Sequence, residues 1–259
     1  MTAQQDPQPN TQPGVHETIL GWFPPERFAR ILDAGAGEGA LSDALARRGY
    51  RVIASDRDPI GFRPRGIPFV QADFNATLPF ATESFDAVVS AEVLEHLENP
   101  HHLAREFARI LRPEGTLVLT TPNILQVYSR IHLLLLGTFD FFDTLSGNRE
   151  GAFRGQMGHI NPVAFPELRY ALERAGFEVR DVSTNRDIRA ALHNGTLWMA
   201  LVRCLIRPIA LFIHAVTRVI RRSDPLSMRL LTPSLLLSED LIVVAERCPG
   251  PTRGHTTAA

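Results

Sequence analysis

The chain has 259 residues, 44% hydrophobic and 21% charged, enough to bury one sizeable core but not two large domains. Its net charge of −1 gives no bulk attraction for nucleic acid. Lysine is absent and only two cysteines are present, which excludes a lysine Schiff base, a P-loop lysine and a disulfide framework.

The first half of the chain alternates short apolar runs with segments of helical periodicity. Residues 1–14 are polar, rich in Pro and Gln and unlike a signal peptide, so a disordered tail is predicted there. Strands are predicted at 30–35, 50–56, 68–73, 85–93 and 115–122, with helices at 40–49 and 100–113. This βαβ pattern predicts a Rossmann-like α/β fold.

The second half contains two insertions. The first, 123–159, is apolar and then glycine-rich, and loops of this length are usually functional. A helix follows over 165–175, opened by Pro and closed by Gly, before another strand. The second insertion, 186–238, precedes a last strand at 240–248. We therefore expect one domain over 15–248 and a disordered tail at 249–259.

A glycine-rich turn, ILDAGAGEGA, occupies residues 31–40. Such a turn lets a ligand approach the backbone and a helix N-terminus. The dinucleotide fingerprint can be placed on it, with Asp56 at the distance of a ribose-binding acid. However, Asp33 and Glu38 would repel a pyrophosphate, whereas they would attract a cationic ligand such as S-adenosylmethionine.

Several motifs occur in order: ILDAGAGEG, VIASD, VQAD, FDAVVSAEVLEHL and LRPEGTLVLTTPN. They resemble the motifs of class I S-adenosylmethionine-dependent methyltransferases. Within that superfamily the chain is most similar to the ubiquinone-biosynthesis O-methyltransferase (methyltransferase type 11) group and to related bacterial enzymes of envelope-glycan and lipid pathways. The resemblance covers 28–123, 159–184 and 240–247. It implies a seven-stranded, mostly parallel sheet with helices on both faces and an antiparallel last strand.

The resemblance also implies a cofactor site for S-adenosylmethionine. Asp33 would lie near the ammonium group, Asp56 would accept the ribose hydroxyls, Asp73 would receive the adenine amino group and Ala91 would sit near the sulfonium. The alternative for Asp56 and Asp73 is strand-end capping by a turn former. The full implied set is Asp33, Gly35, Ala36, Gly37, Gly39, Asp56, Arg57, Asp73, Phe74 and Ala91.

The stretch AEVLEHL carries the candidate catalytic residues. Glu92, Glu95 and His96 would share one face if a helix begins here, and His159 lies later in GHINP. The set resembles the metal ligands of small-RNA 2′-O-methyltransferases, which implies Mg²⁺, Mn²⁺ or Zn²⁺. Two alternatives remain: His96 acts as a metal-free base or substrate contact, or these residues are structural.

Residues 197–222 are apolar but interrupted by charge, so they are not expected to span a bilayer. At about 100° per residue, five of their basic side chains fall within an arc of about 60°. These side chains are Arg203, Arg207, His214, Arg218 and Arg221. The pattern is typical of a basic amphipathic helix on an anionic membrane surface. The alternative is a helix packed on the protein's own core with its arginines outward.

Together these features predict a methyltransferase that O-methylates a small or lipid-linked acceptor, such as a sugar hydroxyl or quinone-like phenol. We expect a cytoplasmic enzyme, peripheral on the inner face of the cell membrane. The alternatives are a metal-dependent small-RNA 2′-O-methyltransferase, an NAD-dependent oxidoreductase and a cofactor-binding protein without catalysis. Against the first alternative, the sequence shows no basic, aromatic-interleaved pattern that would bind RNA, so nucleic acid is not an expected partner. The second is disfavoured by Asp33.

Overall fold

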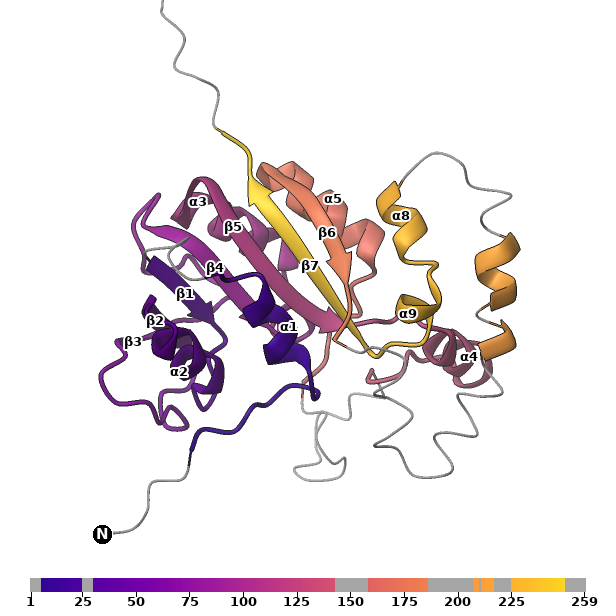
Figure 1. The fold of residues 1–259 in the computed structure, drawn as a ribbon, viewed down its shortest axis with the longest axis horizontal. Coiled ribbons are helices and arrows are strands. Elements are labelled where there is room, and N and C mark those ends of the chain that lie inside the picture. The colour runs from indigo at the N-terminus through magenta and orange to yellow at the C-terminus, as the bar shows by residue number, and fades with distance from the viewer. Residues whose placement is uncertain are drawn as a thin grey trace, which may run out of the picture.

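The computed structural model describes residues 6–24, 30–142, 158–185, 207–209, 211–216 and 225–249. Within these residues, seven strands form one sheet in the order β3-β2-β1-β4-β5-β7-β6 (Figure 1). Their bounds are β1 Arg30–Ala34, β2 Arg51–Asp56, β3 Phe69–Gln71, β4 Phe85–Ala91, β5 Leu111–Pro122, β6 Phe177–Ser183 and β7 Asp240–Arg247. Strands β1 to β5 pair in parallel, and β7 runs antiparallel to both β5 and β6. The predicted fold class is confirmed.

Helices cover both faces of the sheet (Figure 1). Their bounds are α1 Val15–Gly21, α2 Ala40–Arg47, α3 Pro100–Ile110, α4 Val127–Leu136, α5 Phe165–Ala175, α8 Pro225–Arg229 and α9 Pro233–Leu236, and a short 3₁₀ turn, η1, spans Leu94–His96. Among the described residues, no helix has the length and apolar character needed to cross a bilayer.

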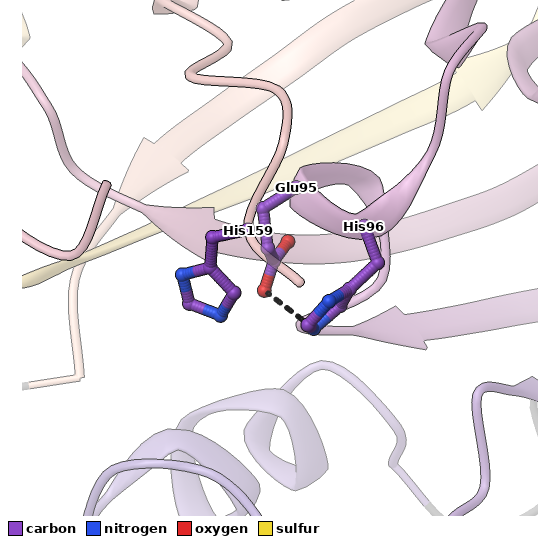
Figure 2. A group of neighbouring side chains, drawn as sticks. All are labelled: Glu95, His96 and His159. Atoms are coloured by element: carbon purple, nitrogen blue, oxygen red, sulfur yellow. Dashed lines mark ion pairs between the residues drawn. The ribbon is translucent and has the colours of Figure 1, made fainter. Parts of the chain in front are cut away.

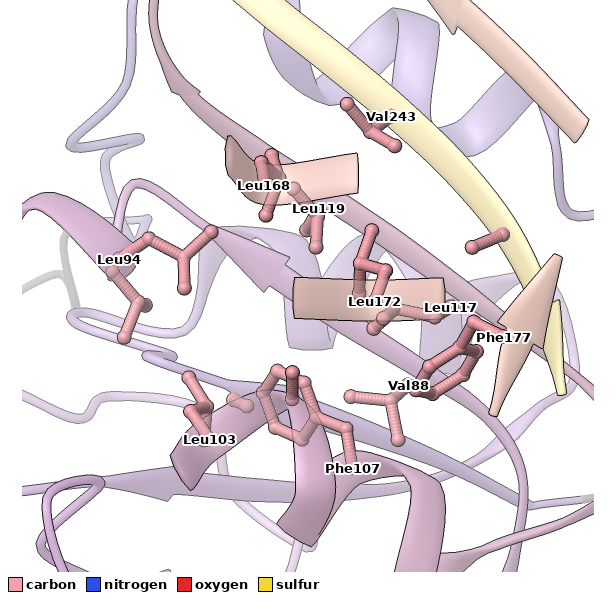
Figure 3. Packing of buried hydrophobic residues seen from close by; sticks show 14 of the residues in the cluster. Val88, Leu94, Leu103, Phe107, Leu117, Leu119, Leu168, Leu172, Phe177 and Val243 are labelled. Atoms are coloured by element: carbon pink, nitrogen blue, oxygen red, sulfur yellow. The ribbon is translucent and has the colours of Figure 1, made fainter. Parts of the chain in front are cut away.

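Two apolar clusters fill the space on either side of the sheet, because successive residues of a strand point to opposite faces. Val88 and Leu117 belong to the cluster under α3 and α5, which Figure 3 shows. Their neighbours Val89 and Val118 belong to the cluster under α1 and α2. The central strands are therefore buried on both faces, as expected for a parallel sheet.

Local signals set most element ends. The side chain of Asn99 accepts the His102 N–H at 2.9 Å and Pro100 opens α3, so this helix begins where the sequence predicts. Gly176, with φ +98°, ends α5. Other boundaries differ: α3 ends at Ile110 because the chain turns directly into β5 at Leu111, and β3 is shorter than predicted.

Candidate active site

The glycine turn between β1 and α2 leaves a bare stretch of backbone. Gly35, Gly37 and Gly39 have φ values of +88°, +51° and +91°, in the left-handed region that other residues rarely adopt. A Cβ on Gly35 would lie 2.2 Å from Val93 Cγ2. The Gly35 N–H donates to the Ser55 carbonyl at 2.8 Å, so the turn is held against β2.

Asp33 is fully buried at the end of β1. Its Oδ2 accepts a hydrogen bond from Ser42 Oγ at 2.6 Å. Burial raises the pKa of Asp33 to about 6, and the Ser42 hydrogen bond opposes part of this effect. Because a buried carboxylate is costly without a cation beside it, this position favours a cationic ligand over a pyrophosphate.

Asp56 and Asp73 follow the neighbouring strands β2 and β3. Oδ2 of Asp56 accepts the Gly37 N–H at 2.8 Å, and its Oδ1 accepts the Asp58 N–H at 3.3 Å. Oδ1 of Asp73 accepts the Asn75 N–H at 2.9 Å. Both acids therefore cap local turns, as the alternative interpretation expects. They also line the cavity described next, so the two roles coexist.

A cavity of about 680 Å³ lies at the carboxyl ends of the parallel strands, where open α/β sheets bind their ligands. Its lining includes the predicted cofactor-binding residues Asp33, Gly35, Ala36, Gly37, Asp56, Arg57, Asp73, Phe74 and Ala91. Gly39 is not part of the lining. It is the N-cap of α2, and a Cβ there would lie 2.5 Å from Pro64 Cδ, so glycine is required for packing.

The cavity has further lining residues that the sequence did not identify. They include Gln8, Pro9, Asn10, Thr11, Gln12, His16, Leu97, Pro122, Phe141 and Asp240. Residues 6–14, predicted as part of a disordered tail, instead belong to the folded structure, because they contact the glycine turn and α1. Burial lowers the pKa of His16.

One of these residues has a recognisable sequence signal. Asp240 begins β7 and pairs in register with Pro122 at the end of β5. Because β7 runs opposite to the parallel strands, its first residue lies at the same sheet edge as their last residues. An acid at this position was therefore a candidate, in the same way as Asp33 and Asp56.

The region after β4 differs from the prediction. Glu92 has φ +55°, and only the 3₁₀ turn η1 follows, so Glu92, Glu95 and His96 do not share a helix face. Glu92 Oε1 accepts from Thr120 Oγ1 at 2.6 Å. Burial raises the pKa of the Glu92 and Glu95 carboxyls, and the charge of the neighbouring Glu92 raises the pKa of Glu95 further.

His96 and His159 bring two imidazole rings together (Figure 2). His96 Nδ1 donates to the Gly158 carbonyl and His159 Nδ1 to the Phe141 carbonyl, each at 3.1 Å. Because a carbonyl only accepts, each neutral ring carries its proton on Nδ1 and offers a lone pair at Nε2. Burial lowers the pKa of both rings, and His96 lowers the pKa of His159 further.

Glu95 completes this cluster. Its Oε1 lies 4.0 Å from His96 Nε2 and is buried without a hydrogen-bond partner. One ligand atom from each of Glu95, His96 and His159 lies within 4.8 Å of the others. Among the described residues Glu92 is not in this group, so the predicted four-residue metal set is reduced to three. His96 and His159 also line the cavity.

Comparison with known proteins identifies this architecture. A family model described as a methyltransferase domain matches residues 13–182. A Mycobacterium tuberculosis protein named "Probable S-adenosylmethionine-dependent methyltransferase" is 37% identical over 114 residues, 42% of this chain and 41% of the relative. A "Ubiquinone biosynthesis O-methyltransferase" of Xanthomonas campestris is 40% identical over 104 residues, 37% of this chain and 44% of the relative. The chain thus spans less than half of the curated relatives it matches.

A solved structure agrees over a longer range. The crystal structure of a SAM-dependent methyltransferase from Archaeoglobus fulgidus aligns over 90% of this chain and 93% of that chain, with a TM-score of 0.57 and 19% identity. At this identity the likeness concerns the fold alone.

Proposed function

The chain belongs to the methyltransferase domain family, and from this premise we propose that it transfers the methyl group of S-adenosylmethionine to a hydroxyl oxygen of a small or lipid-linked acceptor. The observation that carries the proposal is one cavity lined by both nine of the ten predicted cofactor residues and the two histidines His96 and His159. Methyl transfer from a sulfonium requires alignment, exclusion of water and removal of the acceptor's proton.

The electrostatics of the glycine turn support S-adenosylmethionine over NAD. The cofactor carries an ammonium and a sulfonium, whereas NAD carries two phosphates. Asp33 is buried and its pKa is raised to about 6, so above that pH it presents a negative charge that only a cation relieves. Asp56, at the end of β2, retains Oδ1 and Oδ2 lone pairs for ribose hydroxyls while it caps the turn.

His96 is the candidate base for the acceptor hydroxyl. Its Nδ1–H is committed to the Gly158 carbonyl, which leaves the Nε2 lone pair available for the acceptor's proton. The lowered pKa of His96, caused by burial, keeps the ring neutral and able to accept a proton at neutral pH. Phe141 and Asp240 line the same cavity and are candidates to position the acceptor.

The same cluster fits a divalent ion. Two neutral imidazoles offer Nε2 lone pairs, and Glu95 Oε1 is a buried oxygen without a hydrogen-bond partner. Two imidazoles with one carboxylate suit Zn²⁺ or Mn²⁺ better than Mg²⁺, which prefers oxygen ligands. An ion held by Glu95, His96 and His159 would lower the pKa of an acceptor hydroxyl bound to it.

Exposed apolar side chains on α4 and on the segment 211–216 support a lipid-linked acceptor. On α4, Leu134 and Leu135 are 83% and 73% exposed, and Phe212, in the helical segment 211–216, is 68% exposed. Contiguous exposed apolar side chains of this kind are typical of a protein or membrane contact. We therefore place the proposed reaction at a membrane surface.

The two helical segments belong to one part of the fold. Ile131 of α4 and Ile213 both pack against the small buried cluster of Val127 and Leu236, so α4 and the segment 211–216 lie side by side (Figure 1). After α4 ends at Leu136, the chain leads to Phe141, which lines the cavity. The apolar surface is thus close in sequence to the acceptor side of the cavity.

The predicted basic helix 197–222 is described only in part, and Arg203, Arg218 and Arg221 lie outside the described residues. His214 was predicted to share the outward basic arc, but its Nδ1 lies 2.6 Å from the Leu231 carbonyl oxygen, so it is turned toward the protein. Between residues 188 and 223 the sequence nevertheless has six arginines and no acidic residue. This charge favours an anionic lipid surface.

Calorimetry with S-adenosylmethionine, its demethylated product and NAD tests the cofactor assignment. We expect the first two to bind and NAD not to bind. Asp56→Ala should weaken binding by about 1–3 kcal/mol because polar partners lose their acceptor. The matched control is Asp58→Ala, which removes a nearby exposed acid outside the cavity. Binding of NAD without a response to S-adenosylmethionine would reject the proposal.

Labelled-methyl transfer to lipid and small-molecule extracts then identifies the acceptor class.

A further inference from the structure

The segment before α1 crosses the cofactor cavity and is held at both ends. At one end the backbone N–H of Gln8 donates to Glu38 Oε2 at 2.9 Å. Glu38 lies inside the glycine turn, next to Gly37. The hydrogen bond from Gln8 is the largest cause of the lowered pKa of Glu38, so the carboxylate is charged when this contact forms.

The other end is held by a residue distant in the sequence. Asn185, just after β6, donates from Nδ2 to the Pro13 carbonyl at 3.0 Å. Gly14 has φ +90°, and a Cβ there would lie 2.7 Å from the Asn185 carbonyl oxygen. Only glycine therefore permits this approach, and α1 begins directly after it.

Between these two contacts, residues 8–12 line the cavity. Asn10 also approaches the glycine turn: its Nδ2 would be 3.0 Å from a Cβ placed on Gly37. Proline occupies positions 7, 9 and 13. Because proline restricts φ, these residues reduce the entropy lost when the segment is ordered across the cavity.

We propose that residues 8–12 form an N-terminal strap that covers the cofactor and limits the rate at which S-adenosylmethionine and its product exchange. This inference rests on the proposed function. A ligand held against the glycine turn lies between the strap and the turn, so it leaves only when the Gln8–Glu38 hydrogen bond opens. The strap thus adds a kinetic element to the site that none of the sequence motifs contains.

The donor in this contact is a backbone N–H, so proline substitution removes it selectively. Gln8→Pro should increase the dissociation rate of the demethylated product, measured by stopped-flow, by about tenfold. The matched control Gln8→Ala keeps the N–H and should dissociate at the wild-type rate. Gln8 is exposed, so neither variant should unfold the protein. Equal dissociation rates for Gln8→Pro and Gln8→Ala would overturn the proposal.

A second pair of variants tests the acceptor. Oε1 of Glu38 also accepts a hydrogen bond from Arg63 Nη2 at 3.0 Å. Glu38→Ala therefore removes both contacts, whereas Arg63→Gln leaves the Gln8–Glu38 hydrogen bond in place. We expect faster dissociation from Glu38→Ala than from Arg63→Gln. Equal effects of these two variants would mean that the Arg63–Glu38 contact, and not the Gln8–Glu38 hydrogen bond, limits dissociation, and would reject the strap. Failure of the wild type to bind either ligand would instead reject the proposed function, so the two failures are distinguishable.

Discussion

Thr120 holds both the backbone and the side chain of Glu92. Its Oγ1 accepts the Glu92 N–H at 3.1 Å and donates to Glu92 Oε1 at 2.6 Å. Glu92 has φ +55°, a conformation that costs energy for a residue with a side chain. The two hydrogen bonds offset this cost and direct the carboxyl group toward the cavity, which Glu92 lines.

Thr120→Val should therefore destabilise the protein and impair turnover. The Glu92 carboxyl loses the Thr120 hydroxyl donor, and the Glu92 N–H keeps only its longer hydrogen bond to the Thr120 backbone carbonyl at 3.3 Å. This change should cost about 1–3 kcal/mol in the free energy of unfolding. We expect kcat to fall more than the affinity for S-adenosylmethionine. Thr120→Ser keeps the hydroxyl and should restore kcat. If Thr120→Ser is as impaired as Thr120→Val, the packing of the threonine methyl group matters rather than its hydrogen bonds.

Because of Asp33, the stability of the protein and its affinity for the cofactor should change with pH in opposite directions. Its pKa rises from 3.8 to about 6 on burial, so the folded state binds more protons than the unfolded state between these values. The unfolding free energy of the ligand-free protein should therefore decrease as pH rises through this window. The affinity for S-adenosylmethionine should increase over the same window, because the ammonium group requires the ionised carboxylate.

Asp33→Asn separates these effects. Asparagine does not ionise but can still accept from Ser42 Oγ through its carbonyl oxygen. Denaturation at several pH values should show a smaller pH dependence of stability, and calorimetry should show weaker S-adenosylmethionine binding at neutral pH. Unchanged affinity in this variant would mean that the carboxylate does not contact the cofactor's ammonium group.

The cluster of Glu95, His96 and His159 makes a clear prediction about metal. If it holds an ion, EDTA should abolish turnover and Mg²⁺, Mn²⁺ or Zn²⁺ should restore it. His159→Gln should lose the metal response measured by calorimetry. The control His101→Gln changes a histidine of α3 outside the cluster and should respond as the wild type does.

Turnover that is insensitive to chelation would instead support His96 as a metal-free base. In that case His96→Ala should lower kcat by about 10²–10⁴-fold. Because burial lowers the pKa of His96, activity should persist as the pH falls below 6.5, the ordinary value for this side chain. If activity is already lost at pH values above 6.5 as the pH is lowered, the assignment of His96 as the base is contradicted.

The exposed leucines of α4 should bind lipid vesicles. Wild-type protein should float with vesicles that contain anionic phospholipid, and less with neutral vesicles, because arginine attraction adds to apolar burial. The double variant Leu134→Gln and Leu135→Gln should remain at the bottom of the gradient. Ile60→Gln is the matched control, since Ile60 is 90% exposed elsewhere on the surface. Wild type that does not float with anionic vesicles would favour a soluble acceptor.

The residue pattern alone predicted an alternation of strands and helices and the glycine turn, whereas the seven-stranded sheet with its antiparallel last strand was implied by the family resemblance. Strand and helix periodicity, Pro100 before α3 and Gly176 after α5 are local signals, and they act over a few residues. Asp33 and Asp56 were identified from their spacing to the glycine turn and from the family resemblance, and the structure places both at the carboxyl ends of neighbouring parallel strands. Such features depend on spacing along the chain.

The rest of the site depends on contacts between distant segments. The sequence placed Glu92 in a strand over 85–93, with a helix considered only as a condition for a shared face, whereas Thr120 on the neighbouring strand stabilises a left-handed residue there. His96 meets His159 only because the chain after the first insertion returns to η1, where the Asn161 N–H donates to the Glu95 carbonyl. Side-chain convergence of this kind is decided by tertiary packing, since no periodic pattern encodes which remote backbone group will satisfy a given donor.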